Sequence, residues 1–244
     1  MKENKYDSIN FFTEYSKMNR SINGLEGAGE WHILQKMLPD FKNKRVLDLG
    51  CGFGWHCQYA AEQGAASVVG IDISERMLAE ARKKNNFSNV EYKLIPIEDI
   101  DCPAESFDIV ISSLAFHYLE SFNSICQKVN HCLAQGGSFV FSVEHPVFTA
   151  QGKQDWHYDE TGKPLHWPVD HYFESGIRTA NFLGEAVTKY HRTLTTYIND
   201  LIQSGFEIKA LSEPEPEERL LKMIPGMDQE LRRPIFLIIA ALKK

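Results

Sequence analysis

Residues 46–54 read Val-Leu-Asp-Leu-Gly-Cys-Gly-Phe-Gly, an apolar segment that runs directly into three closely spaced glycines. The apolar part predicts a short strand over 45–49, and residues 55–63 have the spacing of a helix that Gly64 ends. Glycines between a strand and a helix let the backbone come close to a ligand, because no Cβ is in the way. This segment therefore predicts the first strand, loop and helix of an α/β fold.

The rest of the chain continues this alternation. Further strands are predicted over 67–71, 90–95, 107–112, 138–143, 206–211 and 235–242. Helices are predicted over 74–84, with Ser74 as N-cap, over 122–133, and after Thr193, which is available as a cap. The pattern indicates a Rossmann-like sheet of seven strands with helices on both faces. The last two strands have no good helix between them, so we expect an antiparallel pair at the sheet edge.

Composition restricts the partners and the compartment. The 244 residues carry a net charge of −7, which argues against a nucleic acid or an anionic membrane surface as the main partner. The start has no apolar stretch typical of a signal peptide, and the longest apolar run, 235–242, is too short to cross a bilayer. The five cysteines form no Cys-x-x-Cys pair. We expect reduced thiols, no metal site and a cytoplasmic location.

The glycine spacing separates two classes of nucleoside cofactor. A dinucleotide fingerprint has the spacing Gly-x-Gly-x-x-Gly, and here Trp55 occupies the position of its third glycine. Asp48, just before the loop, would repel a phosphate but suits an amino group. Asp72 ends the second strand, where a carboxylate can accept hydrogen bonds from both ribose hydroxyls. The residues favour a cofactor with an amino acid end over one with a pyrophosphate.

Four segments together resemble successive motifs of the class I S-adenosylmethionine-dependent methyltransferases. They are 46–54, Gly-Ile-Asp-Ile-Ser at 70–74, Ile-Glu-Asp-Ile at 97–100 and Ser-Phe-Asp-Ile-Val-Ile-Ser-Ser-Leu-Ala-Phe-His at 106–117. The likeness is to the small-molecule branch with a UbiE/BioC-type domain, and it covers about 43–143 well and 205–242 in outline. It implies a sheet whose last strand is antiparallel and S-adenosyl-L-methionine as the cofactor.

The resemblance also implies a set of cofactor contacts. The residues expected to make them are Tyr15, Arg20, Asp48, Gly50, Cys51, Gly52, Asp72, Ile73, Met77, Glu98, Asp99, Ser113 and Leu114. Residues 50–52 would hold the methionine end, Asp72 the ribose, and residues 98–99 the adenine. Residues 113–114 would lie beside the methionine moiety, and Arg20 could pair with its carboxylate.

Other interpretations stand beside these roles. Met77 and Tyr15 could each be ordinary core residues, and Met77 is otherwise expected to pack on the adenine. Asp99 could be a solvated loop residue or a helix cap. Asp48 could be an ordinary carboxylate at a strand end.

The single domain of residues 1–244 is expected to have four parts. Residues 1–42 form N-terminal cap helices, 43–145 the cofactor-binding half, 146–192 a substrate lid insertion, and 193–244 the C-terminal half of the sheet. Residues 148–189 have no sustained period and are rich in glycine, histidine and aromatic residues, which is typical of a lid. Those aromatic residues could line an apolar substrate site or form a small core of their own.

Two histidines are the catalytic candidates. Methyl transfer from a sulfonium is an in-line displacement, so the protein needs a general base only when the acceptor must lose a proton. His145 follows the fifth predicted strand and His117 the fourth, so both lie at the carboxyl edge of the sheet. Each could instead be a hydrogen-bonded or packed loop histidine. His191 and Arg192 could bind an anionic group of the acceptor or tie the lid to the domain.

The sequence thus predicts a methyltransferase that moves a methyl group to an oxygen, nitrogen or carbon of a small-molecule acceptor. It is expected to be a monomer or homodimer without nucleic acid or membrane partners. The alternatives are a non-catalytic S-adenosylmethionine-binding regulator and, less favoured by the Trp55 spacing, a nicotinamide oxidoreductase. The acidic charge disfavours methylation of RNA or protein.

Overall fold

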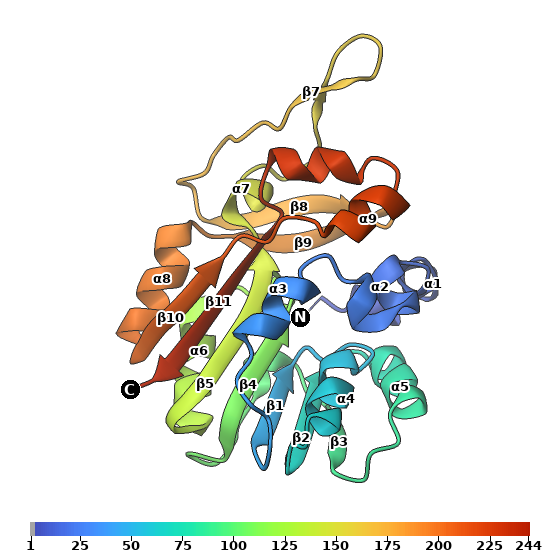
Figure 1. Cartoon of the computed structure of the whole chain (residues 1–244). Coiled ribbons are helices and arrows are strands. Elements are labelled where there is room, and N and C mark those ends of the chain that lie inside the picture. The colour runs from blue at the N-terminus through green and yellow to red at the C-terminus, as the bar shows by residue number, and fades with distance from the viewer. Residues whose placement is uncertain (1–2) are drawn as a thin grey trace.

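A central sheet of seven strands organises the computed structural model, which describes residues 3–244 (Figure 1). Its strands, in spatial order, are β10 (Phe206–Ser212), β11 (Phe236–Lys243), β5 (Leu133–Glu144), β4 (Phe107–Ser113), β1 (Arg45–Leu49), β2 (Ser67–Asp72) and β3 (Val90–Leu94). Strand β11 is antiparallel to both of its neighbours, whereas the pairs among β1 to β5 are parallel. The expected Rossmann-like sheet and its antiparallel last pair are therefore confirmed. The chain order reverses between β1 and β4, which is where ligands of such sheets bind.

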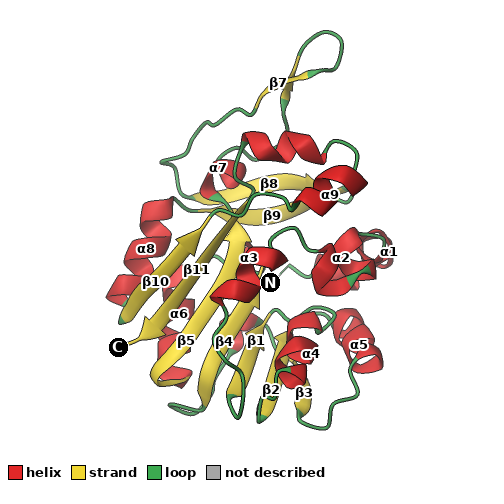
Figure 2. Cartoon of the chain, viewed as in Figure 1, coloured by secondary structure: helices red, strands yellow, loops and turns green. Residues whose placement is uncertain are grey.

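Helices cover both faces of this sheet (Figure 2). The α-helices are α1 (Ile9–Ser16), α2 (Asn19–Ile22), α3 (Trp31–Met37), α4 (Trp55–Glu62), α5 (Glu75–Lys84), α6 (Phe122–Cys132), α7 (Pro146–Thr149), α8 (Leu194–Gln203) and α9 (Glu218–Met223). The short 3-10 helices are η1 (Lys5–Asp7), η2 (Gly24–Gly27), η3 (Ile97–Asp99), η4 (Phe116–Tyr118) and η5 (Met227–Arg232).

Alternate residues of the central strands enter two different cores. In β1, Leu47 and Leu49 pack in the core of α6 and α8, whereas Val46 packs in the core of α4 and α5. Strands that are buried on both faces in this way read as continuous apolar runs. The expected caps are confirmed as well: the side chains of Ser74 and Thr193 accept backbone N–H bonds at the starts of α5 and α8.

The insertion after β5 contains regular strands, contrary to the expectation for 148–189. A hairpin of β8 (Gly176–Phe182) and β9 (Glu185–His191) lies against the carboxyl edge of the sheet (Figure 1). A smaller hairpin, β6 (His157–Tyr158) and β7 (Pro164–His166), projects beyond it. In β8 only Ala180 is fully buried, so the hydrophobic alternation that reveals a strand is nearly absent from its sequence.

The segment between β10 and β11 also differs from expectation. It contains α9 and η5, although the acidic sequence there predicts no helix. Helix α9 has six residues and buries only Leu220, which is too short a segment for a helical period to be visible. Within residues 3–244, no helix combines the length and the apolar character needed to span a membrane.

Candidate active site

A cavity of about 1160 Å³ lies at the carboxyl edge of the sheet. Its walls come from the ends of β1, β2, β4 and β5, from the N-terminal segment and from the β8–β9 hairpin. The predicted site residues that line it are Tyr15, Arg20, Gly50, Cys51, Gly52, Asp72, Ile73, Met77, Glu98, Ser113, Leu114 and His117. The predicted residues outside its lining are Asp48, Asp99 and His145. One cavity therefore gathers residues that are far apart in sequence.

The loop after β1 needs its glycines for two reasons. Gly50 and Gly54 both have φ of +75°, a left-handed conformation that favours glycine. A Cβ at Gly50 would lie 2.7 Å from the Cβ of Ala115, and one at Gly54 would lie 2.2 Å from Oη of Tyr92. Gly50 thus lets the loop pack closely against Ala115, and Gly54 lets it pack closely against Tyr92.

Asp48 lies beneath this loop and is almost fully buried. Its Oδ2 atom accepts a bond from Sγ of Cys57 at 3.3 Å, and its Oδ1 atom has no hydrogen-bond partner among the described residues. Burial raises the pKa of Asp48 to about 7. An unpartnered carboxylate oxygen at this position fits a nearby amino group, although Asp48 does not itself line the cavity.

Asp72 joins the end of β2 to the glycine loop. Its Oδ2 atom accepts the backbone N–H of Gly52 and its Oδ1 atom that of Ser74, each at 2.9 Å. Burial raises the pKa of Asp72 to about 6. Each carboxylate oxygen can accept more than one bond, so this arrangement leaves acceptor capacity for hydroxyls in the cavity.

Arg20, Glu30 and Ser113 form a polar cluster, of which Arg20 and Ser113 line the cavity and Glu30 is buried behind them. Nη2 of Arg20 lies 3.0 Å from Oε1 of Glu30 and 3.3 Å from Oγ of Ser113. Burial by itself would raise the pKa of Glu30, but the guanidinium of Arg20, His56 and the hydrogen bonds to the carboxylate together hold that pKa below its ordinary value. Sequence reasoning missed Glu30, because a lone glutamate in a glycine-containing loop gives no signal of its partner.

Residues of α5 and of η3, which follows β3, line another side of the cavity. Met77 is 3% exposed and lines the cavity, so both of its interpretations, core and cofactor contact, fit its position. Nζ of Lys128 donates to the carbonyl oxygens of Glu98 at 2.6 Å and Ile100 at 3.2 Å, which fixes η3 against α6.

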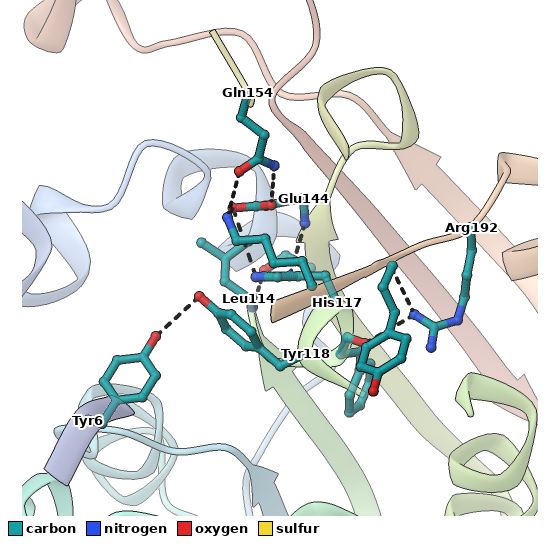
Figure 3. A network of polar contacts seen from close by, with 11 residues as sticks. Tyr6, Leu114, His117, Tyr118, Glu144, Gln154 and Arg192 are labelled. Carbon is teal, nitrogen blue, oxygen red and sulfur yellow. Dashed lines mark hydrogen bonds and ion pairs between the residues drawn. The ribbon is translucent and has the colours of Figure 1, made fainter. Parts of the chain in front are cut away.

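The opposite end of the cavity contains a buried ion pair (Figure 3). Nζ of Lys189, in β9, lies 2.6 Å from Oε1 of Glu144, at the end of β5, and donates to Oε1 of Gln154 at 2.8 Å. Gln154 in turn donates through Nε2 to Oε2 of Glu144 at 2.8 Å. Lys189 is 2% exposed. The cluster ties the insertion to the sheet, and sequence reasoning did not single out any of its three members.

His117 belongs to the same end of the cavity. The backbone N–H of Glu144 donates to its Nδ1 atom at 3.4 Å, and its Nε2 atom lies 3.9 Å from Oε1 of Glu144. Burial lowers the pKa of His117 to about 4, against an opposing effect of Glu144. We assign the neutral tautomer with its proton on Nε2, because Nδ1 acts as the acceptor.

His145 occupies a different environment. Its Nδ1 atom accepts the backbone N–H of Val147 at 3.0 Å and caps α7, and its Nε2 atom lies 2.7 Å from Oε1 of Glu213. Burial lowers its pKa, and Glu213 opposes this. Both ring nitrogens are therefore engaged away from the cavity lining. The geometry gives its catalytic role no support, and that role stays a prediction.

Three tyrosines in contact with one another, Tyr6, Tyr15 and Tyr118, line the cavity. Tyr6 donates through its hydroxyl to that of Tyr118 at 3.3 Å (Figure 3), and its ring packs edge-on against Tyr15 at 5.2 Å between centroids. Burial raises the pKa of all three phenols. They therefore remain neutral hydrogen-bond donors at physiological pH.

The aromatic residues of the insertion divide between two roles. Phe148 and Phe182 line the cavity, whereas Trp156 and Trp167 do not. The guanidinium of Arg233 lies 4.0 Å from the ring centroid of Trp167. The tryptophans therefore belong to a small aromatic core beside η5.

The two polar residues at the end of the insertion are structural. Arg192 is buried and donates to the backbone carbonyls of Phe116, Leu119 and Tyr190. His191 contacts Oγ1 of Thr149 and the carbonyl oxygen of Tyr172, each at 2.8 Å. They tie the insertion to the domain, which was one of the two expected roles.

The fold and the site together define a class I methyltransferase. A glycine loop after β1, an acidic residue at the end of β2 and an antiparallel β11 converge on one cavity. The model of a methyltransferase domain family matches residues 47–141. Within residues 3–244, no group of three or more His, Cys, Asp or Glu side chains could hold a metal ion.

Whole-chain comparisons give the family. A crystal structure from Listeria monocytogenes, assigned to the S-adenosylmethionine-dependent methyltransferases, is 59% identical, with a TM-score of 0.86 over 91% of this chain and 99% of that one. An S-adenosylmethionine-dependent methyltransferase from Mesorhizobium loti is 41% identical, with a TM-score of 0.84 over 90% of this chain and 100% of that one. The chain belongs to the S-adenosylmethionine-dependent methyltransferases. This assignment decides against a nicotinamide oxidoreductase.

A third comparison covers about half of this chain. The ubiquinone biosynthesis O-methyltransferase of Neisseria meningitidis serogroup C is 35% identical over 130 residues, which are 48% of this chain and 55% of that protein. This chain therefore matches about half the length of that relative.

The residues of the cavity fit S-adenosylmethionine. Next to its lining, the buried atoms Oδ1 of Asp48 and Oε2 of Glu30 have no hydrogen-bond partner among residues 3–244, and the lining itself includes the carboxylate of Asp72 and the guanidinium of Arg20. When bound, this cofactor supplies a methyl group on a sulfonium.

Proposed function

We propose that this methyltransferase acts on an oxygen, nitrogen or carbon atom of a small-molecule acceptor. The acceptor would bind between the cofactor loops and the β8–β9 hairpin. The observation that carries this proposal is the single cavity of about 1160 Å³ that extends from Asp72 to Lys189. It is larger than the roughly 300–1,000 Å³ of a pocket for one small ligand, which supports two ligands side by side.

The chain's own residues would position these two ligands. We assign the ribose to Asp72, the methionine end to residues 50–52 and 113–114, and the methionine carboxylate to Arg20. In-line transfer depends on holding the acceptor at the methyl group and excluding water. The insertion, acting as a lid, and the tyrosines would close the cavity for this purpose.

Supporting observations come from outside the cavity as well. The net charge of −7 disfavours a polyanionic acceptor such as RNA. The Neisseria relative is a ubiquinone biosynthesis O-methyltransferase, so a small acceptor has a precedent among its relatives. We further propose that the protein acts in the cytoplasm, as a monomer or homodimer.

A direct test combines cofactor binding with an acceptor screen. Calorimetry should show binding of S-adenosylmethionine, with a loss of at least tenfold in Asp72→Ala and no change in the control Asp159→Ala, whose carboxylate lies in the β6–β7 turn. Incubation with a metabolite library should then release S-adenosylhomocysteine with at least one acceptor. Cofactor binding without turnover of any small molecule would contradict the proposal and favour a regulator.

A further inference from the structure

Three hydrogen-bond donors line the part of the cavity near Glu144, and the rings of His117 and Tyr118 lie 4.3 Å apart between centroids. The donors are Nζ of Lys189, Nε2 of His117 and Oη of Tyr118, and all three residues line the cavity. Nζ and Nε2 lie 2.6 and 3.9 Å from the same oxygen of Glu144, so the first two donors are close neighbours.

Each donor retains a hydrogen for a ligand. Lys189 uses two of its three N–H groups, on Glu144 and Gln154. Nε2 of His117 lies beyond hydrogen-bond distance of Glu144. Tyr118 accepts the bond from Tyr6, and its own hydroxyl hydrogen has no acceptor among residues 3–244. The subsite therefore offers three donors that an anionic oxygen group could satisfy.

Among the described residues, the groups in contact with these three donors are not ready to remove a proton. Nδ1 of His117 accepts the N–H of Glu144, and both oxygens of Glu144 accept bonds from Lys189 and Gln154. The buried tyrosine Tyr118 keeps its proton. An ammonium, alcohol or phenol would need a base to become a nucleophile, whereas a carboxylate needs none.

The charge balance favours the same kind of acceptor. Lys189 and Glu144 neutralise each other at this end, and the buried guanidinium of Arg192 adds a positive charge that acts on His117. A sulfonium then adds one positive charge to a poorly solvated site, where an ammonium beside it would be repelled and a carboxylate attracted.

On the basis of the proposed function, we infer that the acceptor is a carboxylic acid, methylated on its carboxylate, which Lys189, His117 and Tyr118 hold in place. A lone pair of the carboxylate oxygen forms the new O–CH₃ bond. The S–CH₃ bond breaks, and its electron pair stays on sulfur. The products are a methyl ester and neutral S-adenosylhomocysteine, and no proton is transferred.

The binding test uses the full chain saturated with S-adenosylhomocysteine. Formate, acetate and benzoate are titrated against formamide, acetamide and benzamide, and butylamine serves as the cation. The signal is the Cε1–H resonance of His117, assigned with His117→Gln. We expect a saturable shift with the carboxylates and no saturable shift with the amides or the amine. Equal responses to carboxylates and amides, or no response to any carboxylate, would overturn the inference.

Two variants and one control examine the donors themselves. Tyr118→Phe should weaken carboxylate binding about fivefold, because one hydrogen bond is lost, and Lys189→Met at least tenfold, because a charge is lost. Lys209→Met is the control, since this lysine is exposed in β10 and pairs with Glu207. Binding of S-adenosylhomocysteine and the melting temperature report on the fold, and Tyr118→Phe decides the matter if Lys189→Met is unfolded. Unchanged carboxylate affinity in a folded Tyr118→Phe would contradict the subsite.

An activity test separates this inference from the function on which it rests. A library of acids, amines, phenols and alcohols is incubated with S-adenosylmethionine, and mass spectrometry detects methylated products. Methyl esters would support the inference. Methylation of amines or phenols without any ester would overturn it and leave small-molecule methyl transfer standing.

Discussion

The cofactor half, residues 43–145, and the insertion, residues 146–192, are built on different principles. In the cofactor half, short-range features fix the geometry, such as the left-handed glycines and the N-cap Ser74. In the insertion, a few polar contacts between distant residues hold the segment in place, above all the ion pair between Lys189 and Glu144. One side of the cavity is therefore formed by conformations that the local sequence determines. The other side is formed by contacts between residues that are far apart in the sequence.

The largest effect is expected from removing the ion pair between Lys189 and Glu144, which joins the two regions. Lys189→Met leaves the carboxylate of Glu144 buried without its partner, so we expect the free energy of unfolding to fall by about 3–4 kcal/mol. Denaturant unfolding measures this loss. The double variant Lys189→Met/Glu144→Gln should recover more than half of it. A loss of less than 1 kcal/mol in Lys189→Met would show that this ion pair does not hold the insertion in place.

The next effect contrasts two left-handed glycines, one in each region. Gly50→Ala would force a Cβ against Ala115, so we expect kcat/KM to fall at least 100-fold, which corresponds to about 2.7 kcal/mol. Gly162→Ala, in the insertion, has φ of +83° and no atom within 4 Å of its new Cβ. It should keep kcat/KM within twofold while losing about 1 kcal/mol of stability. Equal effects on turnover would remove the contrast between the two regions.

A third effect concerns pH. The pKa of Asp48 is raised to about 7 in the folded protein, so the ligand-free fold is stabilised while the carboxyl is protonated and loses that stability as pH rises through 7. We expect a loss of about 3–4 kcal/mol from this residue between pH 4 and pH 8, since its pKa rises from 3.8 to about 7. Urea unfolding across this range should show a flatter dependence in Asp48→Asn. The same slope in both proteins would refute the raised pKa.

The smallest effect compares a cap with an exposed aromatic residue. Ser74→Ala removes the bond that Oγ accepts from the backbone N–H of Met77 and the bond that it donates to Oδ1 of Asp7, and should cost about 1–2 kcal/mol. Phe173→Ser, in the insertion, changes a side chain that is 91% exposed and should stay within about 0.5 kcal/mol. Thermal unfolding measures both. A larger loss in Phe173→Ser would mean that this exposed ring is covered in solution.

The sequence predicts the parts of the site whose geometry is local. The run 46–54 and Asp72 could be recognised because strand ends, glycine spacing and a following helix are all encoded within a few residues. Glu30 and Lys189 could not be recognised from the sequence. Glu30 pairs with Arg20, and Lys189 pairs with Glu144, which lies 45 residues before it in the chain. His145 stands out in the sequence because it follows a predicted strand, but Pro146 starts a short helix there, and the ring of His145 caps that helix.

The place of β11 in the sheet has a consequence for biosynthesis. This strand lies between β5 and β10, yet it follows both of them along the chain. While the chain leaves the ribosome, β10 therefore has no sheet partner and β5 presents an unpaired edge, a state that is open to aggregation. Half of the sheet, and with it the Glu144 end of the cavity, is completed only when residues 236–243 have emerged.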